Sequence, residues 1–204
     1  MVRPRFGKLA PEQQQAILRA ARDEFARRGF HDASLNRVID DAGISKGSMY
    51  YYFDDKEDLF ATVVRTDLEQ LFARVGPFPV PDGQSADAYW TILEGYYLRL
   101  MTGLIATPDL AALIRGLLAA TTPALAQAQS DLTRALTPWL EQVVAQGQRA
   151  GAVRDDLPSD LLTAVVMGMG QAIDTWLIDR HPADVDLPHL VRVLFGMIRG
   201  AVRP

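Results

Sequence analysis

The side chains best suited to binding chemistry are concentrated in one short segment, residues 45–52. Ser45, Lys46 and Ser48 supply two hydroxyl groups and an ammonium group, and three consecutive tyrosines follow Met49. Groups of these types donate hydrogen bonds to phosphate oxygens and base edges, and glycine at position 47 lets the backbone approach a ligand closely. The segment is therefore a candidate nucleic-acid contact.

The same residues also match a hydrolase motif. The stretch Gly43 to Gly47 reads G-x-S-x-G, the pattern of a nucleophile elbow, and His181 and His189 lie downstream. That elbow requires a strand before the serine, whereas the residues before Ser45 predict a helix. No histidine has glutamate three residues before it, which argues against a di-iron bundle. We therefore expect no enzyme activity, no catalytic residue, no metal ion and no cofactor.

Two short predicted helices position the segment. The first begins after the N-cap Ser34 and ends at Gly43, which supplies a left-handed residue. The second begins after the N-cap Ser45, and its Met49 and Phe53 face inward. Helices of about two turns that meet in a short glycine-containing turn are typical of a DNA-binding helix-turn-helix.

Longer predicted helices flank this pair. Apolar residues recur at helical spacing over 16–25, and Gly29 is expected to end that helix. Asp54 with Glu57 predicts the start of another, and its apolar residues form one long stripe over 59–75. The amino-terminal part of the chain is thus expected to be a small helical domain followed by a long helix.

The segment from Gly29 to Leu59, GFHDASLNRVIDDAGISKGSMYYYFDDKEDL, strongly resembles the TetR family of one-component regulators. The resemblance is specific over residues 12–60 and looser beyond them. It implies that residues 42–50 form the turn and the recognition helix, and that Lys56 touches DNA phosphate. Asp55 stands where the family usually has serine, a change that an N-cap tolerates.

These patterns predict a set of DNA contacts, with some alternatives left open. Ser34 and Ser45 can be helix caps as well as phosphate ligands. Tyr52 either packs against the domain or joins the contact surface. Three basic residues form either an arm that reaches the backbone or the minor groove, or a solvated tail: Arg3, Arg5 and Lys8. The predicted contacts are Ser34, Ser45, Lys46, Gly47, Ser48, Tyr50, Tyr51 and Lys56.

The composition is that of an ordinary globular protein, with 49% hydrophobic and 23% charged residues. The net charge is −4, but residues 1–53 carry nine Lys and Arg against six Asp and Glu, a balance of +3 that fits DNA binding. The absence of cysteine excludes disulfides and fits a cytoplasmic protein. We expect no membrane helix, because Gln171 and Asp174 interrupt the apolar run 161–178.

Beyond residue 75 the sequence predicts five further helices and no strand. Three prolines and two glycines break the chain over 76–83, and Pro138 either kinks or splits the segment 123–148. The expected fold class is all-α, with a three-helix helix-turn-helix domain at 1–55 and a larger helical effector-binding and dimerisation domain at 56–204. The later helices are expected to start at Ser85, Pro108, Pro123, Pro158 and Asp186.

The last two long helices are expected to form a homodimer. Residues 161–178 and 190–202 are apolar around much of their circumference. The TetR resemblance implies the same pairing, which presents two recognition helices to a near-palindromic operator. It also implies a pocket for a small, largely apolar effector. The candidate lining residues are Trp90, Tyr97, Met101, Trp139, Met167, Gln171 and Asp174; for the last two, a buried hydrogen-bonded role or an interface role is the alternative.

The predicted function is a TetR-like DNA-binding transcriptional regulator, and more specifically a repressor. The effector would release it from its operator by shifting the helix at 56–75. The competing interpretation is a helical protein-interaction module without specific DNA binding. Binding to the DNA upstream of its own gene distinguishes the two.

Overall fold

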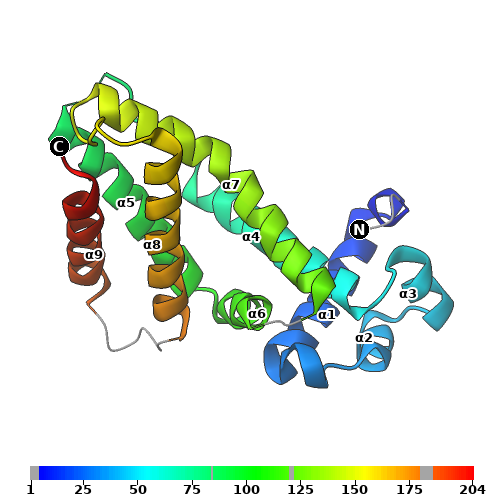
Figure 1. Ribbon diagram of the computed structural model, residues 1–204. Helices are drawn as coiled ribbons and strands as arrows, with labels where there is room; N and C mark the ends of the chain where they lie inside the picture. Colours follow the sequence, from blue (N-terminus) through cyan, green and yellow to red (C-terminus); the bar gives the residue numbers. More distant parts are fainter. Residues whose placement is uncertain (1–4, 84, 120–121, 180–185) are drawn as a thin grey trace. The chain divides into compact units, whose positions relative to one another are not determined.

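The computed structural model describes residues 5–83, 85–119, 122–179 and 186–204, and these ranges contain helices but no strand. The predicted fold class is confirmed. A short 3-10 helix, η1 (Phe6–Lys8), precedes the α-helices (Figure 1). These are α1 (Pro11–Asp32), α2 (Leu35–Ala42), α3 (Lys46–Tyr52), α4 (Lys56–Val75), α5 (Ala86–Ile105), α6 (Pro108–Leu118), α7 (Pro123–Arg149), α8 (Ser159–Asp179) and α9 (Leu187–Val202).

The chain divides into two compact units. The first comprises Met1–Gln70 and Thr107–Gln129, and the second comprises Leu71–Ala106 and Ser130–Pro204. α4 and α7 each contribute residues to both units. The boundary expected between residues 55 and 56 describes a division of function and stays a prediction. The compact units differ from it because α6 packs on α1, a helix far earlier in the sequence.

An aromatic cluster forms the centre of the first unit. The Phe60 ring of α4 lies 5.0 Å from the ring of Phe25 and 5.2 Å from that of Phe30, measured between centroids. Gly116 of α6 lies against the same Phe60 ring, since a Cβ there would be 3.3 Å from its Cζ. The apolar stripe predicted for α4 is buried at Leu59, Phe60, Val63, Val64, Leu68 and Leu71. Burial of the stripe up to Leu68 holds α1, α4 and α6 around one core, whereas Leu71 belongs to the second unit.

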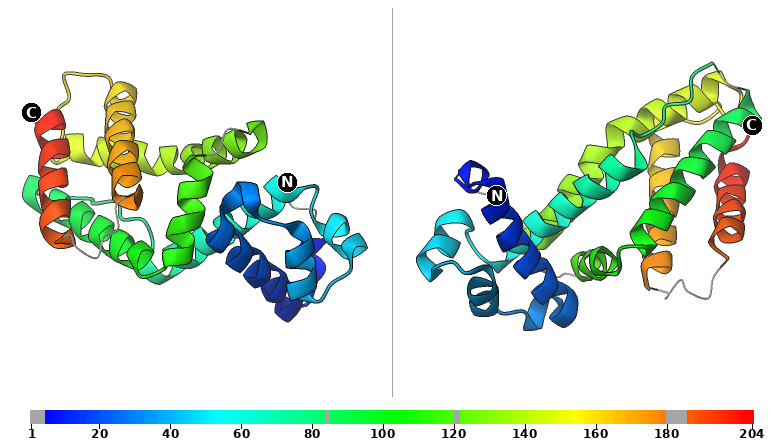
Figure 2. Two further views of the ribbon diagram at one scale, coloured as in Figure 1. Left: turned by 90° about the horizontal axis from the view of Figure 1, so that it is seen from below. Right: turned by 180° about the vertical axis from the view of Figure 1, so that it is seen from behind.

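The core of the second unit is built from α5, α7, α8 and α9. Tyr89 of α5 is buried, and its hydroxyl donates a hydrogen bond to the Val143 carbonyl at 3.0 Å. Gly147 lets α7 approach this ring, because a Cβ would lie 2.7 Å from the Tyr89 hydroxyl oxygen. Figure 2 shows α8 and α9 next to each other, and α9 also packs on α5. The five later helices that the sequence predicts are all present.

Two helices differ from the simplest sequence interpretation. Gly29 does not end α1 but interrupts it, with φ of 72° and ψ of 170° three residues before the helix ends at Asp32. Pro138 lies inside α7, which runs as one helix from Pro123 to Arg149. Pro138 therefore does not split the segment into two helices.

The start of α4 is capped one residue later than expected. Oδ1 of Asp55 accepts a hydrogen bond from the Asp58 N–H at 2.7 Å. Asp58 in turn accepts the Asp54 N–H through Oδ2 at 3.2 Å. Asp55 therefore caps α4 through the Asp58 N–H, as the first half of a capping box does, but the return bond to Asp58 comes from the residue before the cap.

One helix of the described ranges meets the length and composition criteria for a membrane span, contrary to expectation. The segment Ser159–Ile178 has a mean hydropathy of 1.5 and is 22% buried. A single helix of this kind is weak evidence for a membrane protein, because a helix that packs its apolar surface on other protein meets the same criteria.

Candidate DNA-binding surface

The turn between α2 and α3 has the geometry that the sequence predicts. Gly43 ends α2 with φ of 65° and ψ of 31°, a left-handed conformation that favours glycine. The Ile44 N–H donates to the Ile39 carbonyl at 3.1 Å. Ser45 then caps α3, since its Oγ accepts the Ser48 N–H at 3.0 Å. These bonds fix the direction in which α3 leaves the turn.

Two buried side chains fix the rotation of α3 about its axis. Met49 and Phe53 are both buried, as predicted. The opposite face of the helix is open to solvent, with Tyr50 and Tyr51 exposed at 45% and 48%. Six of the eight predicted DNA contacts therefore lie together on this helix and its cap: Ser45, Lys46, Gly47, Ser48, Tyr50 and Tyr51.

Ser34 lies at the start of α2 as predicted, but its side chain does not cap the helix. Instead, its backbone N–H donates to Oε1 of Glu24 at 2.8 Å. Oε1 of this buried carboxylate also accepts a hydrogen bond from Nε of Arg37 at 2.7 Å, which lowers the pKa of Glu24 below its ordinary value. Glu24 thus ties the start of α2 to α1 by accepting the N–H of Ser34 itself, a different donor from the one that a Ser34 side-chain cap would satisfy.

Lys56 forms contacts within the domain that the resemblance does not imply. Its Nζ donates to the carbonyl oxygens of His31 at 2.9 Å and Ala33 at 3.3 Å, and lies 4.8 Å from the centroid of the Phe30 ring. The lysine therefore satisfies carbonyl groups at the end of α1 that have no helical partner. Lys56 is half-buried, and its contact with a DNA phosphate stays a prediction.

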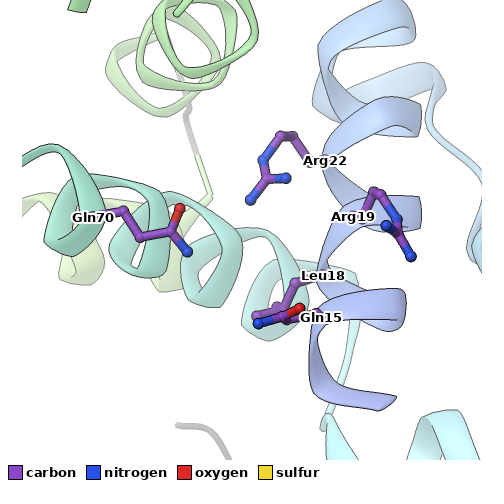
Figure 3. A pocket seen from close by; sticks show the side chains of 5 residues that line it. All are labelled: Gln15, Leu18, Arg19, Arg22 and Gln70. Atoms are coloured by element: carbon purple, nitrogen blue, oxygen red, sulfur yellow. The ribbon is translucent and has the colours of Figure 1, made fainter. Parts of the chain in front are cut away.

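An ion pair joins α1 to α4 beside a cavity of about 290 Å³. Figure 3 shows the Arg22 side chain extending from α1 toward α4. Its guanidinium donates two hydrogen bonds to the buried carboxylate of Asp67, which raises the pKa of Arg22. The ion pair fixes the position of α4 against α1 within the first unit. The cavity is lined by Gln15, Leu18, Arg19, Arg22 and Gln70.

The predicted effector contacts all belong to the second unit. Trp90 and Met101 are buried, and Met167 is half-buried. The indole N–H of Trp139 donates to the Pro79 carbonyl at 2.8 Å. Much of this set therefore contributes to the packing of the unit, and a role in effector binding stays a prediction.

Two of the three remaining effector candidates, Tyr97 and Asp174, are in direct contact. The Tyr97 hydroxyl donates to Oδ1 of Asp174 at 2.6 Å, and burial raises the pKa of both groups. Gln171, one turn earlier on α8, is exposed. Its exposure favours the interface role that the sequence left open, whereas the half-buried Asp174 accepts a hydrogen bond. Effector binding by either residue stays a prediction.

Two residues that shape the surface were missed by the sequence analysis. Glu24 lies seven residues after Ile17, so helical spacing places it on the apolar face of α1. A charged residue on that face was the available signal, since a buried carboxylate needs a partner. Phe6 is buried against Tyr52 and Phe53, and its signal was a single aromatic side chain in a basic segment.

A short exposed helix, fixed by a glycine turn against a second short helix, defines a helix-turn-helix DNA-binding protein. Residues 17–63 match the family model described as bacterial regulatory proteins, tetR family. Over 53 residues, 26% of this chain and 27% of the relative, the chain is 42% identical to the uncharacterized HTH-type transcriptional regulator YdgC of Bacillus subtilis.

Two further proteins are similar over nearly the whole chain. The HTH-type transcriptional repressor AcnR of Corynebacterium diphtheriae is 25% identical over 201 residues, which cover 94% of this chain and 92% of that protein. The fold is also similar to that of the transcriptional regulator FadR from Bacillus subtilis, whose crystal structure is a complex with stearoyl-CoA. The two structures match with a TM-score of 0.71 at 19% sequence identity, and the match covers 93% of this chain and 99% of FadR. The match to the TetR-family model thus covers the helix-turn-helix domain, and the two curated relatives named above are transcription regulators.

Proposed function

We propose that this TetR-family regulator is a cytoplasmic repressor that binds its operator as a homodimer and leaves it when a small, largely apolar effector binds. The observation that carries the proposal is the exposed face of α3. Buried Met49 and Phe53 hold the helix, and its outer face carries Lys46, Tyr50 and Tyr51. An ammonium group supplies charge for phosphate, and phenolic groups on the same face supply donors for base edges.

Exposed apolar side chains on α8 and α9 support the homodimer. Met197 is the most exposed of them at 57%. Four glycines on these helices, at positions 168, 170, 196 and 200, have open space where a Cβ would point, so a second helix can approach closely. A second copy of the same face covers such a surface in a two-fold dimer. The exposed side chains are Leu161, Val165, Trp176, Val193 and Met197.

Two relatives support the regulatory part of the proposal. AcnR is named a repressor, and FadR is bound to stearoyl-CoA, a molecule with a long apolar chain. In this chain the effector would bind in the second unit, near the predicted residues around Tyr97 and Asp174. α4 contributes residues 71–75 to that unit and residues 56–70 to the first. A shift of α4 on effector binding would change the spacing of the two α3 helices in the dimer.

Footprinting of the DNA upstream of its own gene, followed by a screen for release, tests the proposal. We expect a near-palindromic protected site and at least one apolar compound, with stearoyl-CoA as the first probe, that weakens binding about tenfold or more. If no compound changes the affinity, a regulator controlled by a protein partner replaces the effector model. If no DNA sequence is preferred, the chain is a helical protein-interaction module.

A further inference from the structure

The segment that precedes α1 is attached to the recognition helix. Phe6 of η1 is only 5% exposed. Its ring centroid lies 4.9 Å from that of Phe53 and 6.1 Å from that of Tyr52, at the end of α3. The Leu9 N–H donates to the Phe6 carbonyl at 3.1 Å and closes the short helix. A solvated tail would not bury an aromatic ring in this way, so residues 5–9 form part of the domain.

This attachment places a guanidinium group beside the exposed face of α3. The Cζ atom of Arg5 lies 4.5 Å from the centroid of the Tyr51 ring, in a cation–π contact. Both residues are exposed. A guanidinium stacked on a ring keeps the N–H groups at its edge available for hydrogen bonds. The cation therefore lies next to the proposed DNA-reading face with its donors accessible.

We propose that Arg5 binds a DNA backbone phosphate next to the site read by α3. The planar fork of an arginine matches the oxygens of a phosphate, and stacking on Tyr51 reduces the conformational entropy lost on binding. Phe6 positions this contact without touching DNA. The inference rests on the proposed binding of DNA by α3 and adds a second, separate point of attachment.

Replacement of Arg5 by glutamine in the full-length chain tests the contact. Binding is measured by fluorescence anisotropy on two labelled duplexes of equal length, the region upstream of its gene and a scrambled sequence, between about 50 and about 200 mM salt. We expect about fivefold weaker binding to both duplexes at the lowest salt, and a slope of log K against log[salt] that is shallower by about 0.9, the value for one phosphate.

Two further variants separate position from charge. Arg65→Gln removes the same charge from α4, nine residues after the start of that helix, where Arg65 is exposed and paired with Glu69 at 4.0 Å. It should leave the salt slope unchanged. Phe6→Ala keeps Arg5 but removes the ring that holds it in place. We expect it to weaken DNA binding almost as much as Arg5→Gln does. Its thermal unfolding midpoint checks that the variant is still folded. Combining Phe6→Ala with Arg5→Gln should add little further loss, because both remove one contact.

The outcomes distinguish this inference from the function on which it rests. An unchanged salt slope in Arg5→Gln, together with weaker binding by Lys46→Ala, overturns the Arg5 contact and leaves α3 as the reader. A loss confined to one of the two duplexes also overturns the phosphate assignment. Unchanged binding by Lys46→Ala contradicts the proposed α3 surface itself.

Discussion

Lys46 and Tyr50 lie one helical turn apart on the exposed face of α3 and are expected to act differently on DNA. Lys46→Ala should weaken binding to all sequences by a similar factor and make the salt slope shallower by about 0.9, because an ammonium contacts phosphate. Tyr50→Ala should change which operator variants are preferred, at a cost of about 1–3 kcal/mol on the best site. Titration of both variants against a set of operator variants checks this pair. Equal losses on every duplex in Tyr50→Ala would refute its role in base reading.

The Glu24 carboxylate gives the domain a dependence on pH. Its pKa is held below the ordinary value of 4.5 by hydrogen bonding to Arg37. A folded pKa below the unfolded one means that the stabilisation is complete above the unfolded value and is lost as the pH falls through the folded value. Glu24→Gln should therefore lower the free energy of unfolding by about 2 kcal/mol at neutral pH. The difference from wild type should shrink below about pH 4, and denaturant unfolding at the two pH values measures it.

At single residues, the sequence predicted which residues begin a helix better than it predicted their hydrogen-bond partners. Ser45 caps α3 as expected, because its own helix supplies the N–H group three residues on. Ser34 occupies the equivalent place before α2, yet its side chain makes no cap, and its own N–H donates to Glu24, ten residues earlier on another helix. Such a contact depends on how two helices pack, and spacing within one helix does not report it.

At the scale of elements, the close approach of α7 to α5 depends on one glycine. Gly147→Ala would place a Cβ 2.7 Å from the Tyr89 hydroxyl oxygen and against Val153, so we expect a loss of about 2 kcal/mol in stability. Gly95→Ala is the matched control on α5, where the nearest side-chain atom would be 3.7 Å away. It should be neutral or stabilising by up to about 1 kcal/mol. Thermal unfolding midpoints of the two variants, compared with wild type, decide whether the approach matters.

Helices were more predictable than their ends. Periodicity and proline or capping residues predicted each α-helix that the structure describes after residue 75, because those signals are local. Asp54 and Asp55 are chemically identical caps, so composition could not decide between them, and the structure selects Asp55. Gly29 was expected to end α1 because a glycine after Arg27 and Arg28 is typical of a helix C-cap, but three further helical residues follow it and Phe30 is buried in the core.

At the scale of the whole molecule, the proposed dimer is testable through α9. Met197→Glu places a charge on the most exposed apolar side chain of the α8 and α9 faces and should convert the dimer to monomers, since a buried unpaired charge is costly. Operator binding should weaken about 100-fold or more because the two half-sites would no longer be bound together. Sedimentation velocity measures the oligomeric state.

Leu118→Glu provides the control for this experiment. Leu118 is an exposed leucine on α6, outside α8 and α9, and acquires the same charge. It should remain dimeric. Dissociation of both variants to the same extent would show that the α8 and α9 faces are not the interface.

The division into units was the least predictable feature. The expected boundary at residue 55 followed the end of the helix-turn-helix, which is a local pattern. The packing of α6 (Pro108–Leu118) on α1 (Pro11–Asp32) joins segments that are far apart in the sequence and moves residues 107–129 into the first unit. The effector candidates were chosen for residue type, and several proved to be core or surface residues because apolar helices do not reveal which side faces a cavity.

The central claim is that α3 reads a particular DNA sequence. The most direct test is the ratio of affinities of the wild-type chain for its footprinted site and for a scrambled duplex of the same length, measured by anisotropy at about 0.15 M salt. We predict that the footprinted site binds about 1,000-fold more tightly or better, as specific regulators do. Equal affinity for the two duplexes would contradict the claim.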